Sequence, residues 1–244
     1  MLNTNTLVVD AAGNLMCWRQ RVEDTHGVQI YLAALYEAMG LLALAGRLRV
    51  RTMDEQVVFS QRCRQAGVKV PAVIRSGNNW MLSTYIPGET LKDSLEKGNR
   101  TQVIPLFLSG LQQAHRRGIA LMDRWGGNEI VTPEEDIVFL DFDVQVTFAG
   151  ARPFAALTAF DLAVAMRACC LWSPDKEMAL TQLRSWWREN GRFYDSSLLA
   201  RFLAGACDFY AHFDSLSGLF LSAPWSQHKL TNAAIGELIA WLGD

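Results

Sequence analysis

The chain has 244 residues, of which 50% are hydrophobic and 20% are charged, and its formal net charge is −2 at pH 7. This composition excludes an intrinsically disordered chain and is typical of a globular protein that buries a core. A charge so close to zero provides no broad basic surface, so no nucleic acid partner is expected. The length fits either one two-lobed domain or two small domains.

The five cysteines are odd in number and form no C-x-x-C pair, which indicates free thiols in a reducing compartment. The N-terminus lacks the basic segment and long apolar stretch of a signal peptide. The most apolar run, residues 28–48, is interrupted by Gln29, Glu37 and Arg47 and falls short of a membrane span. We therefore expect a soluble cytoplasmic protein without a transmembrane segment, and leave peripheral membrane contact open.

The first third of the chain alternates short strand patterns with helical ones. Turn sequences separate the strands of each expected pair, AAGN at residues 11–14 and SGNN at residues 76–79. Thr52 or Asp54 is expected to cap the second helix. The expected strands cover residues 7–9, 15–19, 68–74 and 80–86, and the expected helices cover residues 28–45 and 54–65.

The rest of the chain is mostly helical in pattern, and the segment IPGETL at residues 86–91 marks the change. The expected helices cover residues 102–117, 156–171, 176–190, 196–213 and 232–242, and one hairpin pairs residues 129–131 with 137–141. The prediction is an α+β protein with a small strand-containing N-lobe, residues 1–86, and a mostly helical C-lobe, residues 87–244.

Three polar residues in and beside this hairpin carry the expected chemistry. Asp123 and Asn128 lie in the loop before it, and Asp141 follows its second strand. Magnesium prefers oxygen ligands and is commonly held by one or two side chains together with substrate phosphates. An Asn and an Asp facing one cleft meet that need and leave a second Asp for a nucleophile. The plainer alternatives are loop residues that bond to the backbone, for Asp123 and Asn128, and a strand-end cap, for Asp141.

Several segments in order resemble the protein-kinase-like superfamily, in particular small bacterial lipopolysaccharide-core (Kdo and heptose) kinases. They are AGVKVP at 66–71, YIPGETL at 85–91, HRRGI at 115–119, FLDFD at 139–143 and FDLA at 160–163. The resemblance spans residues 55–167 and implies a two-lobed kinase-like fold that uses ATP and Mg²⁺. It implies that Asp123 is the catalytic base and that Asn128 and Asp141 are the metal ligands.

The same resemblance assigns supporting roles to three further residues. Tyr85 lies in the segment that resembles the hinge beside the nucleotide, so it is expected to contact the cofactor. Asp161 resembles the aspartate that supports the catalytic loop, and His115 is expected to pack or hydrogen-bond at the end of the preceding helix rather than act as a base.

The nucleotide side of the site departs from the kinase pattern. No lysine precedes Lys69, so the strand lysine that contacts the phosphates is absent, and no G-x-G-x-x-G loop is present. Arg19 or Arg21 is the expected replacement for the lysine. For the glutamate that normally pairs with it, Glu55 is the first candidate, beside Gln56 at the family position, and Glu37 is a further one.

The leading hypothesis is a phosphotransferase that moves the γ-phosphate of ATP to a hydroxyl of a glycolipid sugar, a small molecule or a protein. The alternatives are a pseudokinase that binds nucleotide or a partner without transfer, and an unrelated α+β interaction domain. The glycolipid hypothesis gains slightly from tryptophans near the end of the chain, although such residues more often belong to a core. These are Trp172, Trp186, Trp187, Trp225 and Trp241.

Overall fold

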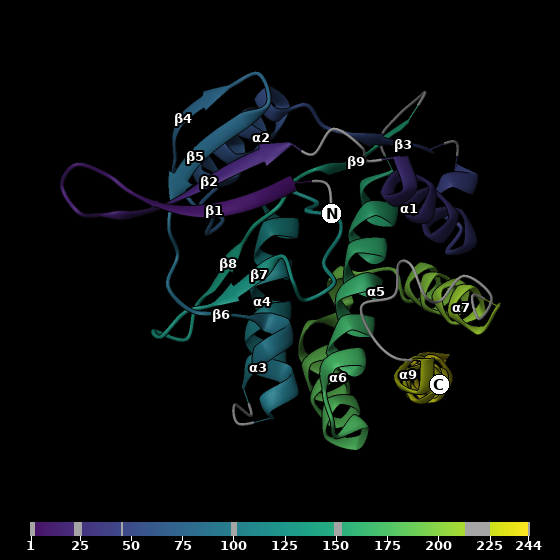
Figure 1. Ribbon diagram of the computed structural model, residues 1–244. Helices are drawn as coiled ribbons and strands as arrows, with labels where there is room; N and C mark the ends of the chain where they lie inside the picture. Colours follow the sequence, from purple (N-terminus) through teal and green to yellow (C-terminus); the bar gives the residue numbers. More distant parts are fainter. Residues whose placement is uncertain are drawn as a thin grey trace.

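The computed structural model describes residues 3–21, 26–44, 46–98, 102–148, 153–212 and 225–243. The N-terminal part contains a four-stranded antiparallel sheet with strand order β1-β2-β5-β4, and α2 (Met53–Gln65) packs against β4 and β5. Figure 1 shows this sheet and α2 above the helices of the C-terminal part. The strands are β1 (Asn3–Val9), β2 (Leu15–Arg21), β4 (Val73–Gly77) and β5 (Trp80–Thr84).

Local chemistry explains why both expected hairpins and the second helix form. In the β1–β2 turn, the Asp10 carboxylate accepts hydrogen bonds from the backbone of Ala12 at 2.9 Å and of Asn14 at 2.8 Å, and Gly13 adopts a φ of 87°. At the start of α2, Thr52 and Glu55 form a capping box, which satisfies backbone N–H groups that the helix leaves unpaired. The prediction of a Thr52 cap is thereby confirmed.

Two predictions in this part were wrong in extent. The helix expected to run to Ala45, a residue outside the described ones, is α1 (His26–Ala38), which ends where Gly40 adopts a φ of 85°. A short 3₁₀ turn, η1 (Leu42–Leu44), follows. The strand expected from residue 68 begins at Val73 instead, because the backbone N–H of Val68 bonds to Cys63 and closes the end of α2.

Three strands were not expected, namely β3, β9 and the two-residue strand β6 (Glu89–Thr90). β3 (Gly46–Val50) pairs antiparallel with β9 (Val144–Phe148), about a hundred residues later in the chain. Because of this pairing, and because α1 packs on α7, elements from the first fifty residues lie against the C-terminal part. The domain boundary after residue 86 falls in the segment between β5 and β6 and stays a prediction.

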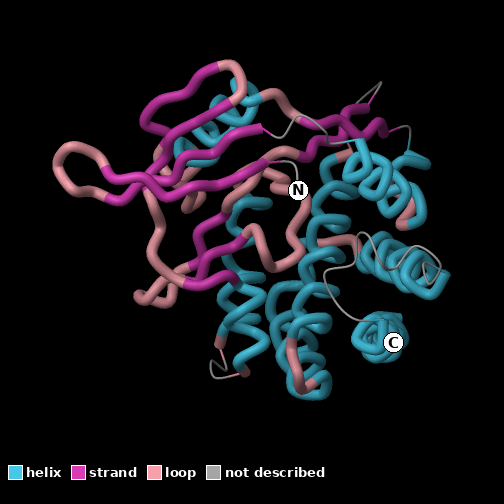
Figure 2. The backbone as a smooth tube through the Cα atoms, viewed as in Figure 1, coloured by secondary structure: helices cyan, strands magenta, loops and turns pink. Residues whose placement is uncertain are grey.

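The C-terminal part is helical around one small sheet of order β6-β7-β8. Figure 2 shows that the strands gather in one half of the molecule and most helices in the other. The strands are β6 (Glu89–Thr90), β7 (Glu129–Val131) and β8 (Ile137–Phe139), and the helices are α3 (Leu91–Lys97), α4 (Val103–Arg116), α5 (Phe154–Trp172), α6 (Lys176–Asn190), η2 (Gly191–Phe193), α7 (Ser196–His212) and α9 (Trp225–Gly243). The predicted hairpin and five helices are confirmed, although α9 starts earlier than expected and the predicted end at Phe213 lies outside the described residues.

Helix α5 forms the centre of this part. It packs against α3, α4, α6, α7 and α9, and nearly all of its side chains are buried. Among the described residues it is the one helix whose length and composition would allow it to cross a membrane, but most of it is enclosed by the protein, as in an ordinary core helix. Burial on all sides makes α5 the rigid element from which the neighbouring loops are positioned.

Candidate active site

The loop after α4 is fixed to α5 by a buried hydrogen-bond chain. The Asp161 carboxylate accepts from the backbone N–H of Leu121 at 2.7 Å and lies 3.0 Å from His115 Nε2. His115 Nδ1 in turn lies 2.9 Å from the Tyr194 hydroxyl. His115 and Asp161 are both buried, so these hydrogen bonds replace the water that would otherwise solvate the Asp161 carboxylate. Both residues therefore lie where they can support the loop that carries Asp123.

The backbone of this loop and of the segment after β8 adopts conformations that residues other than glycine rarely adopt. The φ angles are 60° at Met122, 54° at Asp123 and 55° at Asp141, all in the left-handed region. Asp tolerates this region better than most residues, but each such residue still costs free energy of order 1 kcal/mol. Surrounding contacts must therefore hold Asp123 and Asp141 in place.

Arg124 supplies most of those contacts, and its role was not predicted from the sequence. Its side chain is completely buried and donates to the backbone oxygens of Met122 at 2.5 Å, Leu140 at 3.1 Å and Asp141 at 2.8 Å. It also reaches the backbone oxygen of Asn128 at 3.3 Å. One planar guanidinium thus ties the loop of Asp123 to the strand end of Asp141. The one feature of the sequence that could have indicated this role is the position of Arg124 directly after Asp123.

Glu129 neutralises this buried cation. Its carboxylate lies 3.1 Å from Arg124 Nη1 and accepts from the backbone N–H of Gly126 at 2.9 Å. Burial raises the pKa of Glu129 to about 7, against the opposing effect of Arg124. A buried pair of this kind stabilises a unique loop geometry more than it stabilises the fold.

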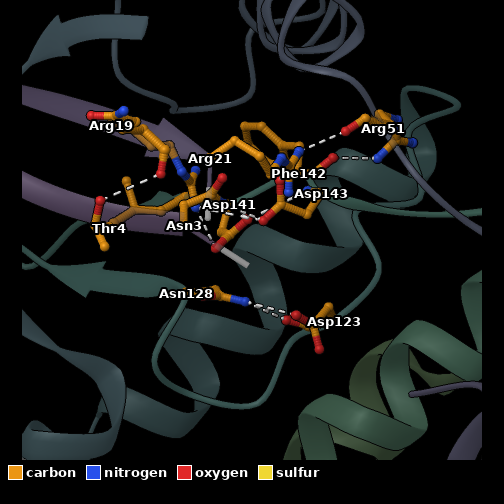
Figure 3. A network of polar contacts seen from close by, with 12 residues as sticks. Asn3, Thr4, Arg19, Arg21, Arg51, Asp123, Asn128, Asp141, Phe142 and Asp143 are labelled. Atoms are coloured by element: carbon orange, nitrogen blue, oxygen red, sulfur yellow. Dashed lines mark hydrogen bonds and ion pairs between the residues drawn. The ribbon is translucent and has the colours of Figure 1, made fainter. Parts of the chain in front are cut away.

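Asp123, Asn128 and Asp141 come together at one wall of a single cavity (Figure 3). Asn128 Nδ2 donates to the backbone oxygen of Asp123 at 2.9 Å and to its carboxylate at 3.1 Å. Because the amide nitrogen is used in this way, the amide oxygen of Asn128 is left to act as a ligand. The bond of Asn128 to the backbone of Asp123, and the bond that the Asp141 carboxylate accepts from the backbone N–H of Asp143 at 3.4 Å, are contacts that the plainer alternatives also describe. The position of all three side chains at one cavity wall is an additional feature.

The oxygen donors fit Mg²⁺ only together with a phosphate-bearing substrate. No group of three His, Cys, Asp or Glu side chains suited to a metal ion occurs among the described residues. The amide oxygen of Asn128 and the carboxylate of Asp141 could provide two protein ligands, which is the usual protein contribution at nucleotide sites. The remaining positions around the ion would be taken by water and phosphate oxygens.

The two carboxyl groups of this wall differ in acidity. Burial raises the pKa of Asp123 to about 6, with Asp141 adding to the rise and Arg124 and Asn128 opposing it. Burial also acts to raise the pKa of Asp141, but Arg19, hydrogen bonds from Asp143 and Arg124 outweigh it, and the pKa is lowered. Asp123 is therefore suited to take up a proton, whereas Asp141 stays ionised.

Cations from the N-terminal strands contact this wall. Arg19 on β2 is buried, forms an ion pair with Asp141 and lies 3.9 Å from Asp143. Arg21 on the same strand lies 3.1 Å from Asp143, and Asn3 on β1 donates to its carboxylate. Burial and the nearby Asp141 raise the pKa of Asp143, against Arg19 and Arg21. Figure 3 shows these side chains meeting between the strands and the FLDFD segment.

Arg19 reaches the cavity wall through its ion pair with Asp141, although it does not line the cavity itself, and the other two expected cofactor residues are not brought there. Glu55 is exposed, and its carboxylate caps α2 and pairs with Arg49 rather than with a cation of the site. Gln56, one residue later, points inward and is completely buried, with both amide atoms unpaired among the described residues. Glu37 is exposed, and Tyr85 is half-buried in the segment after β5, outside the cavity wall.

The cavity has a volume of about 710 Å³ and extends from Asp123 between α1 and the C-terminal helices. Near the loop, Trp125 and Trp172 line it, and the indole N–H of Trp172 donates to the backbone oxygen of Trp125 at 2.6 Å. Of the other tryptophans, Trp186 is buried in the core, and the side chain of Trp225 is outside the described residues. The rest of the cavity, which the sequence did not reveal, is lined by apolar side chains of α1, α5 and α7 and by polar side chains that include Arg167 and His228.

Comparison with solved structures shows the fold class. The chain is similar to an ethanolamine kinase from Plasmodium vivax, with a TM-score of 0.53 and 10% identity over 99% of this chain and 82% of that one. The Rio2 kinase from Chaetomium thermophilum gives a TM-score of 0.44 and 13% identity over 97% of this chain and 69% of that one. The sequence matches no protein-family model and no curated protein. The likeness to the ethanolamine kinase shows that the chain has the α+β fold of the protein-kinase-like class.

Proposed function

We propose that this protein is an ATP- and Mg²⁺-dependent phosphotransferase that acts on a hydroxyl group. The observation that carries the proposal is the convergence of Asp123, Asn128 and Asp141 on one cavity wall. Their backbone is held by Arg124, which donates to the backbone oxygen of Asp141, and by Asp161, which accepts from the backbone N–H of Leu121. Preorganised polar groups aimed at one point are the main requirement of phosphoryl transfer.

In the proposed reaction, the acceptor oxygen attacks the γ-phosphorus of ATP. A new oxygen–phosphorus bond forms, and the bond from the γ-phosphorus to the bridging oxygen breaks, so that its electron pair leaves with ADP. The hydroxyl proton passes to the carboxylate of Asp123, whose pKa of about 6 keeps it mostly ionised near neutral pH while leaving it basic enough to accept a proton.

Asn128 and Asp141 would hold Mg²⁺, which supplies charge neutralisation on the phosphates. Arg19 is the proposed replacement for the absent strand lysine, because it is the cation that already reaches Asp141. Phosphate oxygens entering beside Asp141 would offer this guanidinium a second anionic partner. A cytoplasmic location, where ATP is available, belongs to this proposal.

The second candidate is a nucleotide-binding protein without transfer. The ion pair of Arg19 with Asp141 favours it, because a cation already neutralises the carboxylate that would bind the metal. Both candidates place nucleotide at the same wall, so they differ in turnover rather than in binding.

Thermal unfolding and ADP formation separate the candidates. Saturating ATP with Mg²⁺ should raise the Tm, since a ligand that binds only the folded state stabilises it. This rise should be absent in Asp141→Asn, smaller in Arg19→Ala, partly kept in Arg19→Lys and unchanged in the control Asp136→Asn, which alters an exposed ion pair with Lys69.

ADP formation should then be measured with water, sugars and small alcohols as acceptors. Asp123→Asn should abolish it while keeping the nucleotide-induced rise in Tm. If Asp123→Asn forms ADP as fast as the wild type, the transferase proposal fails and the second candidate is retained. If no nucleotide raises the Tm of the wild type, both fail.

A further inference from the structure

A buried arginine at the far part of the cavity lacks an anionic partner. Arg167 on α5 is 6% exposed and lines the cavity. Its Nη2 donates to His228 Nδ1 at 3.1 Å and to the Asn232 amide oxygen at 3.3 Å, and its guanidinium lies 3.7 Å from the centre of the Tyr210 ring. All three partners are neutral, and no carboxylate among the described residues pairs with Arg167. An uncompensated buried cation is costly to a fold.

Two buried N–H donors at this place have no hydrogen-bond partner among the described residues. Arg167 Nε is one, and His228 Nε2 is the other. A guanidinium can only donate, so His228 Nδ1 must accept the bond from Arg167, and the proton of the neutral ring is on Nε2. Burial and the neighbouring Arg167 lower the pKa of His228 to about 4, so the ring is neutral at physiological pH. The N–H groups of Arg167 Nε and His228 Nε2, together with the positive charge of Arg167, could therefore bind an anionic oxygen acceptor.

Between Arg167 and Asp123 the wall of the cavity is apolar. It is formed by side chains from α1, α5 and α7 and from the residue that follows α1, namely Leu32, Leu35, Met39, Val164, Ala168 and Ala206. At the Arg167 end, Tyr31 also lines the cavity, and its hydroxyl lies 2.7 Å from that of Tyr210.

We propose that Arg167 and His228 form an anion-binding subsite, and that its ligand is an apolar molecule with a carboxylate or a phosphate group. Binding of the anion does not depend on the proposed function. Only the identification of this ligand with the phosphoryl acceptor rests on that function, and it implies that the acceptor carries an anionic group in addition to its hydroxyl. The anion lies against Arg167 and His228, the apolar body fills the middle of the cavity, and the hydroxyl faces Asp123.

Four probes with the same eight-carbon chain test the subsite without nucleotide: octanoate, octyl phosphate, octan-1-ol and octyltrimethylammonium. Binding is followed by the fluorescence of Trp125 and Trp172, which line the cavity, and by the Tm. One or both anions should bind about 10-fold or more tightly than octan-1-ol, as expected for a charge-assisted hydrogen bond in a buried site. The preferred anion distinguishes a carboxylate from a phosphate ligand.

Amino-acid substitutions test which residues cause the preference for anionic probes over octan-1-ol. In Arg167→Met the ratio of anion to alcohol affinity should fall to about one, and His228→Phe should lower it partly. Arg167→Lys should keep part of it, and Arg75→Met, which removes an exposed cation on β4, should leave it unchanged. Because each ratio compares two ligands on the same variant, a moderate loss of stability does not affect it, and near-UV circular dichroism checks folding.

Equal affinity for octanoate, octyl phosphate and octan-1-ol in the wild type would overturn the subsite, as would tighter binding of octyltrimethylammonium. If Arg167→Met does not fold, an anion preference as large in Arg167→Lys and His228→Phe as in the wild type overturns the assignment. The outcome is separable from that of the transferase proposal, since Asp123→Asn should bind the anions normally. An Arg167-dependent preference without any ADP formation would support the subsite and refute the phosphotransferase.

Discussion

Replacement of Asp123 by Asn should stabilise the protein at neutral pH while it abolishes phosphoryl transfer. Asn has nearly the same shape as a protonated Asp, and it tolerates the φ of 54° at this position. Its side-chain oxygen can still accept the hydrogen bond from Asn128. The change therefore removes a buried negative charge with little change in the loop.

The size of the effect follows from the pKa of Asp123, which rises from 3.8 to about 6 on folding. The folded protein holds this proton more tightly than the unfolded chain, so the free energy of unfolding falls as the pH rises between these values. Two pKa units correspond to about 3 kcal/mol, and solvent at the cavity wall reduces this to about 2 to 3 kcal/mol. The wild type and Asp123→Asn should be equally stable near pH 4, and the variant more stable near pH 8.

Urea unfolding of both proteins at a series of pH values measures this difference directly. Asp195→Asn is the control, because hydrogen bonds from Leu198 and Ser197 lower the pKa of that exposed cap, so its replacement should produce no gain in stability with rising pH. If the stabilities of the wild type and Asp123→Asn change in parallel over the whole pH range, then Asp123 is not a carboxylate with a raised pKa. The argument for it as a proton acceptor would then be withdrawn.

Three further predictions test the loop and its surroundings. The rate of ADP formation should fall about tenfold per pH unit below about pH 6, where Asp123 becomes protonated, and a rate that is flat there would contradict its role as a base. Arg124→Met should cost about 3 to 5 kcal/mol in urea unfolding, because it leaves Glu129 buried without its cation, and Arg124→Met/Glu129→Met should recover part of that loss. Gly88→Ala should lower the free energy of unfolding by about 2 kcal/mol or more, because a Cβ at this position, where φ is 143°, would lie 2.3 Å from a backbone oxygen of β7. Gly118→Ala should lower it by only about 1 kcal/mol, because the space around that residue is open. Equal losses in the two variants would contradict the predicted clash at Gly88.

The features that the sequence predicted correctly depend on neighbours in the chain. The cap of α2 at Thr52, the turn at Asp10 and the helices of the C-terminal part all follow from patterns within a few residues. Asp123, Asn128 and Asp141 were found because they lie within one short stretch of sequence whose spacing and neighbouring segments resemble a kinase-like site. Such features can be predicted because the interactions that stabilise them are local.

The tertiary structure alone determined the rest. The ion pair of Arg19 with Asp141 joins residues far apart in the chain, and the pairing of β3 with β9 does the same. Arg124 became identifiable as the organising residue only through its burial, and Arg167 as an unpaired cation only through the packing of α5 against α7 and α9. Burial and the absence of a partner are properties of the closed structure, because they depend on which distant side chains exclude water. The sequence by itself therefore determined the loop that carries Asp123 and the order of the elements around it, whereas the tertiary structure determined the charge environment of that loop and the cavity beside it.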